Sequence, residues 1–209
     1  MKEVSTAPAS RIRTKQTGPR EPLLSNHCDN AVIGGYERYA ASVFDGTATY
    51  EIEDHPNARV LLKIDYPKFK LFLASILWRA SISADSFFCK VKLDPSHEEE
   101  LRIMMLNGKV NDPRRFACCM IYDPTIINYT TQMVLQPDTI TDPSFVCCRF
   151  VMGGLFWFYF IPDCDVELVN KNLVLTPSGA MVIRKERKYG QEFIKRFMFD
   201  VANGLRTDV

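Results

Sequence analysis

The stretch FVCCRFVMGGLFWFYFI, residues 145–161, decides the fold of the second half of the chain. Two largely apolar runs of strand length, 145–152 and 155–161, flank the dipeptide Gly153-Gly154. This arrangement predicts a β-hairpin, because its tight two-residue turn needs a positive φ that glycine adopts freely. Apolar side chains occupy consecutive positions of 155–161, which indicates a strand covered on both faces of its sheet.

Further segments match strands in length and composition. In the second half they are residues 115–123, 127–136 and shorter runs near Leu173 and Met181. In the first half, residues 47–53 and 58–64 lie on either side of the turn residues 54–57. Strands joined by short turns pair antiparallel, so the second half predicts a mostly antiparallel sheet.

The strongest helix signal is DYPKFKLFLASILWRASIS, residues 65–83. Asp65 can cap a helix and Pro67 suits its first turn. Its apolar residues lie nearly all round, which predicts a central helix. Further helices are predicted over 31–44, 96–107 and 189–202. The predicted fold class is therefore α+β: a mostly antiparallel sheet in the C-terminal half, packed with a central apolar helix and two or three further helices.

The composition favours one main domain with a substantial core, since 46% of the 209 residues are hydrophobic. No run reaches the roughly 18 apolar residues of a membrane span, and the N-terminus lacks the apolar core of a secretory signal. Seven cysteines include the adjacent pairs 118–119 and 147–148 inside apolar runs, where they read as small buried residues. We expect a cytoplasmic protein that does not bind membranes.

The net charge of +1 hides basic segments at both ends of the chain. Residues 1–20 hold five basic residues and one acid, and 184–196 hold six basic residues and two acids. Such ends suit the phosphates of DNA or RNA, although solubilising tails have the same composition. The candidate phosphate contacts are Arg11, Arg13, Lys15, Arg20, Arg184, Lys185, Arg187 and Lys188, with Arg79 of the apolar helix as an internal contact.

The chain shows no catalytic motif. His55 stands in a predicted turn, and His97 lacks the second histidine of a metalloprotease motif, because Leu101 occupies that position. A phosphate-binding glycine loop and a GxSxG nucleophile turn are also absent, since PSG at 177–179 reads as a turn before a strand. We assign no catalytic residue and no small-molecule cofactor.

The stretch EPLLSNHCDN, residues 21–30, looks like half of a metal site. Zinc sites commonly use two close pairs of nitrogen or sulfur ligands, but His27 and Cys28 are the only such residues in the first fifty. Ser25 stands three residues before Cys28, where a first cysteine would be placed. The ligand count alone does not predict bound zinc.

Three stretches of the chain, with the hairpin, resemble a group of mostly uncharacterised bacterial proteins known as HNH-endonuclease-like. The stretches are GPREPLLSNHCDNAVIGGYERYA, DYPKFKLFLASILWRASIS and HEEELRIMMLN, followed by RFVMGGLFWFYFI. The resemblance spans roughly residues 13–185. In that group the segment matching 23–28 reads Leu-Leu-Cys-x-x-Cys, and an upstream Cys-x-x-Cys completes a zinc-binding head.

The resemblance implies that only Cys28 carries over, as a relic metal ligand, while zinc belongs to relatives with an intact head. It divides the chain into a flexible basic arm (1–20), a remnant of the head with a helix (21–45) and an α+β body (46–209). We expect a non-catalytic or degenerate relative that binds nucleic acid. The alternatives are an active metal-dependent HNH-type endonuclease with an incomplete head, and a module that binds a protein partner or a second copy of itself.

Overall fold

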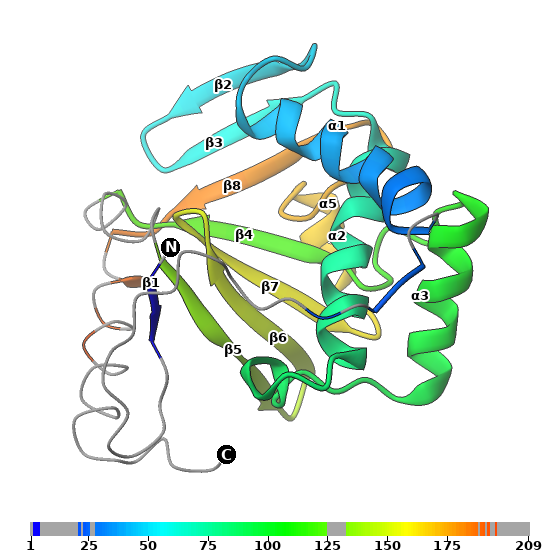
Figure 1. Ribbon diagram of the computed structural model, residues 1–209. Coiled ribbons are helices and arrows are strands. Elements are labelled where there is room, and N and C mark those ends of the chain that lie inside the picture. Colours follow the sequence, from blue (N-terminus) through cyan, green and yellow to red (C-terminus); the bar gives the residue numbers. More distant parts are fainter. Residues whose placement is uncertain are drawn as a thin grey trace.

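The computed structural model describes residues 2–4, 21, 23–25, 28–124 and 133–187, together with 189, 190, 192 and 195. The predicted α+β class is confirmed: helices precede a mixed, mostly antiparallel sheet that comes mainly from the C-terminal half (Figure 1). The strand order is β1-β5-β6-β7-β4-β8-β3-β2, and only the pairs β1–β5 and β4–β8 are parallel.

The elements have the following bounds. The strands are β1 (Lys2–Val4), β2 (Glu51–His55), β3 (Ala58–Leu62), β4 (Cys118–Tyr122), β5 (Met133–Asp142), β6 (Phe145–Met152), β7 (Leu155–Ile161) and β8 (Met181–Lys185). The helices are the π-helix η1 (Cys28–Ile33), α1 (Gly34–Phe44), α2 (Tyr66–Ile82), the 3-10 helix η2 (Ser86–Phe88), α3 (Pro95–Asn107) and α5 (Val166–Asn170).

The hairpin that the sequence predicted is present. Strands β6 and β7 pair from Met152 opposite Leu155 outward, and the turn glycines Gly153 and Gly154 have φ values of 60° and 82°. Positive φ at both central positions fits the type I′ turn, whose twist matches that of the flanking strands. The hairpin therefore forms from local sequence and supplies the centre of the sheet.

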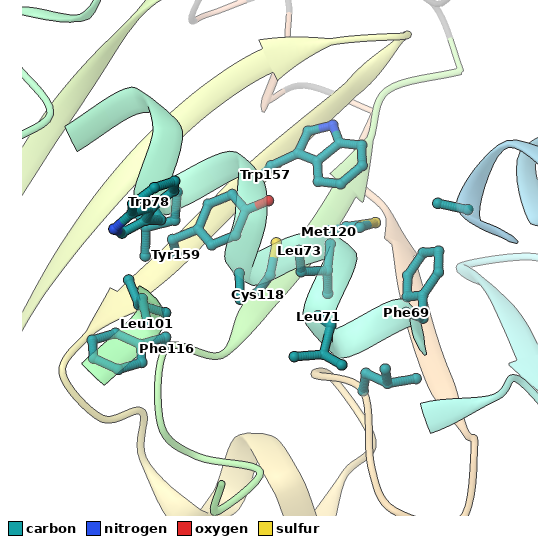
Figure 2. Close-up of a cluster of buried hydrophobic side chains, with 14 of the residues drawn as sticks. Phe69, Leu71, Leu73, Trp78, Leu101, Phe116, Cys118, Met120, Trp157 and Tyr159 are labelled. Carbon is teal, nitrogen blue, oxygen red and sulfur yellow. The ribbon is translucent and has the colours of Figure 1, made fainter. Parts of the chain in front are cut away.

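Helix α2 is central, as predicted. The Asp65 carboxylate accepts a hydrogen bond from the Lys68 N–H at 3.2 Å, and eleven of the 17 helix residues are buried. Helices α1 and α3 both pack against α2. Figure 2 shows the main core around α2, where Trp78 and Phe69 meet residues of β4 and β7 such as Met120 and Tyr159. A smaller apolar cluster around Cys119 and Val174 includes residues of α5.

The structure differs from the sequence prediction at several places. Lys2–Val4, inside the predicted arm 1–20, form a strand that pairs with β5; the pairing depends on an available sheet edge, which hydrophobic periodicity does not report. His55 closes β2 instead of lying in the turn. Near Leu173 the prediction of a strand is wrong, because only a single bridge between Cys119 and Val174 forms there. Residues 127–132 and most of 189–202 lie outside the described part.

Residues 28–44, which the sequence assigned to the head remnant, share the main core with α2 and the sheet. Ile33, Ala40 and Val43 are each at most 2% exposed.

Among the described residues no helix is long and apolar enough to cross a membrane.

Candidate nucleic-acid interface

One row of paired residues crosses the sheet near the end where β4 and β8 stop. From β1 to β8 the row consists of Val4, Leu135, Val151, Phe156, Ile121 and Arg184. Five strand spacings of about 4.8 Å separate its two ends by about 24 Å. The strand of the N-terminal basic segment and the start of the C-terminal basic segment therefore reach the same end of the sheet, at the left of Figure 1.

At this end, two cations lie over one aromatic ring, and both bind the Asp54 carboxylate, so they lie close to each other. The Arg59 guanidinium carbon and the Lys185 Nζ are each 6.0 Å from the centroid of the Tyr122 ring. Arg187 is exposed just after β8, and Arg184 is exposed on β8, where it precedes Lys185 and therefore points to the opposite face of the sheet. We call Arg59, Tyr122, Arg184, Lys185 and Arg187 the basic sheet end. An aromatic face with adjacent cations suits stacked bases and phosphates together.

Two acids offset part of this positive charge. The Asp54 carboxylate accepts hydrogen bonds from Arg59 Nη2 at 2.9 Å and from Lys185 Nζ at 2.5 Å. These bonds lower the pKa of Asp54, so its carboxylate stays ionised at neutral pH. Glu186 pairs with Arg184. Asp54 and Glu186 thus bind three of the four cations of the basic sheet end and fix those side chains, and Asp123, buried directly after Tyr122, is a third acid at this end.

Of the predicted phosphate contacts, Arg184, Lys185 and Arg187 lie at the basic sheet end, with Arg184 and Lys185 on opposite faces of the sheet, and Arg79 lies apart from them. Arg79 Nη2 donates to Glu37 at 2.7 Å, and its Nε donates to the Ser75 carbonyl at 3.2 Å. The guanidinium thus meets an acid, and the side chain is 29% exposed in the wall of a separate cavity. The remaining predicted contacts, Arg11, Arg13, Lys15, Arg20 and Lys188, lie outside the described residues.

The predicted relic ligand Cys28 begins η1 and is half-buried. Its N–H donates to the Ser25 Oγ at 3.3 Å, so Ser25 caps the start of this helix. Within the part of the chain that the structure describes, no group of three or more His, Cys, Asp or Glu side chains is arranged to hold a metal ion. The His27 side chain is outside that part.

Arg59 and Tyr122 were missed at the sequence level. Arg59 lies on a short strand next to a turn, and Tyr122 closes an apolar strand, so neither residue has a distinctive local pattern. They meet Lys185 because β8 inserts between β3 and β4, and its parallel pairing with β4 joins segments about 60 residues apart. Only this strand order reveals the cluster.

Comparisons with protein-family models, with curated protein sequences and with solved structures find no match for this chain. The resemblance to HNH-endonuclease-like proteins stays a prediction. The functional conclusion therefore rests on the side chains described above.

Proposed function

We propose that this protein binds nucleic acid without cleaving it, through the basic sheet end and the basic segments at both ends of the chain. The observation that carries the proposal is the contact of Arg59 and Lys185 with the Tyr122 ring. Cations neutralise phosphates, and an aromatic ring stacks on unpaired bases, so single strands are the preferred ligand. The HNH-like resemblance points to the same class of ligand, and seven free cysteines suit a reducing cytoplasm.

Exchanging Arg184→Gln together with Arg187→Gln should weaken binding and reduce its dependence on salt. Each lost phosphate contact lowers the slope of log affinity against log salt by about 0.7 on single strands and about 0.9 on duplex DNA. The double variant should therefore lose about 1.4 to 1.8 of slope. Fluorescence anisotropy of labelled single- and double-stranded DNA over a salt series measures this change.

The matched control exchanges Arg102→Gln on α3 and Lys109→Gln just after that helix, where Arg102 pairs with Glu99 much as Arg184 pairs with Glu186. It removes the same charge and should leave the slope unchanged. An equal loss in both variants would show that only net charge matters. A variant in which the four basic residues of 11–20 are neutralised shows, in the same titration, how much the basic arm contributes to the salt slope. If the unmodified protein does not bind even at low salt, a protein-interaction module is the better account.

Exchanging Tyr122→Leu should weaken single-strand binding by about 1 to 3 kcal/mol, the usual contribution of one stacked base. The salt slope should stay the same, because no charge is removed, and duplex binding should change less. Tyr36→Leu on α1 is the control, since Tyr36 is also a half-buried tyrosine that lies away from the basic sheet end. A parallel loss on both DNA forms would contradict stacking at Tyr122.

A further inference from the structure

A cavity lies beside the sheet and shares no residue with the basic sheet end, although two of its lining residues, Leu135 and Val151, belong to the row that leads to Arg184. It is a cavity of about 590 Å³ between the second half of α2, η2, the strands β5 and β6, and the segment around Leu24. Small-molecule sites usually measure about 300 to 1,000 Å³ and are mostly apolar with a few charged groups. Eleven of the fourteen lining residues are apolar, and the three charged ones are Glu21, Asp29 and Arg79.

The apolar wall is aromatic and rests on the core. Phe87 and Phe88 of η2 pack edge to face with centroids 5.1 Å apart, and Phe150 of β6 lines the cavity from the sheet. Behind them, Leu135 and Val151 are only 2% and 3% exposed. Such a wall favours a flat apolar body, because burial removes apolar surface from water and rings pack well edge to face.

The charged side chains in the cavity wall determine which ligand charge is favoured. Arg79 is already neutralised by Glu37 at 2.7 Å. The Glu21 carboxylate accepts hydrogen bonds from the Ser83 hydroxyl at 2.6 Å and the Ala84 N–H at 3.1 Å. The Glu21 carboxylate is held as an anion, and the Lys92 ammonium, which donates to the nearby carbonyls of Ser81 and Ser83, offsets part of its charge.

Asp29 supplies the second negative charge. It is exposed on η1, and among the described residues nothing pairs with its carboxylate. A ligand carboxylate would therefore meet the Asp29 carboxylate, the partly offset charge of Glu21 and an arginine that is already paired, whereas a ligand ammonium would meet Asp29 as its main opposite charge. Opposite charges at hydrogen-bonding distance attract and like charges repel, so the wall discriminates between these ligands.

We propose that this cavity binds a small molecule that has a flat apolar body and one ammonium group, with the body between Phe87, Phe88 and Phe150 and the ammonium at Asp29. The site uses no residue of the basic sheet end, so different variants test the two proposals. Failure of either proposal leaves the other intact.

The test uses three probes of one shape and different charge: tryptamine, tryptophol and indoleacetate. Equilibrium dialysis of the full chain against each fluorescent probe gives its affinity. Tryptamine should bind tightest and indoleacetate weakest. Asp29→Asn should reduce the preference for tryptamine over tryptophol by about two- to fivefold, the usual range for an exposed charge contact. Asp94→Asn at the start of α3, where the side chain is 80% exposed, should leave the preference unchanged.

A second pair of variants tests the location. Ile76→Trp places a large ring at the cavity wall and should weaken all three probes by about tenfold or more, as expected if about 1.4 kcal/mol of contact is lost. Ile103→Trp makes the same exchange on α3, where Ile103 is 45% exposed, and should have no effect. Equal affinities for the three probes, or an equal effect of the two tryptophans, would overturn the proposal. So would no binding to the unmodified chain.

Discussion

Exchanging Gly179→Ala is expected to lower the free energy of unfolding by about 2 to 5 kcal/mol. Gly179 has φ +78°, and a Cβ built there would lie 2.4 Å from the carbonyl oxygen of Ile64 and 2.9 Å from its nitrogen. Both atoms are backbone, so no side chain can rotate away. The Ile64 N–H also donates to the Gly179 carbonyl at 3.0 Å, so the two segments cannot separate without losing this bond.

The effect should reach α2. Ile64 directly precedes Asp65, whose side chain caps that helix. A displaced Ile64 therefore disturbs the cap as well as the turn at 177–179. Chemical denaturation followed by circular dichroism measures the loss.

Gly46→Ala is the matched control for this prediction. Gly46 has the same φ of +78°, but a Cβ there would meet nothing within 4 Å. The free energy of unfolding of this variant should fall only by the cost of an alanine in the left-handed conformation, about 1 to 2 kcal/mol. The difference between the two variants isolates the contact with Ile64. Equal losses would show that backbone conformation alone decides, and would contradict the predicted clash.

Turns and helix caps are the parts of the fold that could be predicted from the sequence. The turn at 177–179, the hairpin at Gly153-Gly154 and the cap at Asp65 depend on neighbouring residues, so local patterns were sufficient. The same holds for Gly108, which ends α3 with φ +63°. That Ile64 would lie against Gly179 could not be predicted, because this contact joins two turns 115 residues apart.

The residues of the candidate site also fall into those that the sequence could predict and those that it could not. Arg184, Lys185 and Arg187 are neighbours in the chain, so their grouping could be predicted as a basic run. Arg59 and Tyr122 join them only through the strand order, which one sequence does not determine. Arg79 was predicted as an internal phosphate contact; in the structure its guanidinium pairs with Glu37, which α1 brings across from 42 residues away.

The second large effect concerns a buried lysine that no motif singled out. Lys70 on α2 is only 2% exposed, and its Nζ donates to the carbonyl oxygens of Arg115 at 2.6 Å and Pro113 at 3.4 Å. These bonds fasten α2 to the segment that leads into β4. Burial lowers the pKa of Lys70 to about 8, because the charged ammonium has lost its water.

Lys70→Met is therefore expected to change how stability depends on pH. Between the folded pKa of about 8 and the ordinary value of 10.5, the unfolded chain binds more protons at Lys70 than the folded chain. Stability from this group is complete above pH 10.5 and is lost as the pH falls to about 8. Unfolding free energies of the unmodified protein minus those of the variant should rise by about 2.5 kcal/mol from about pH 7 to about pH 10.

Subtracting the unfolding free energy of the Lys70→Met variant from that of the unmodified protein cancels the pH dependence that buried thiols give to both proteins. Burial raises the pKa of the Cys119 thiol to about 11 and that of Cys147 to about 12, so both proteins lose stability as the pH rises above about 9. Lys68→Met is the control: hydrogen bonding to Asp65 raises the pKa of Lys68, so its contribution falls with rising pH. A Lys70 difference that is flat, or that falls as for Lys68, would show that the folded protein keeps Lys70 charged, with the carbonyls of Pro113 and Arg115 replacing its water.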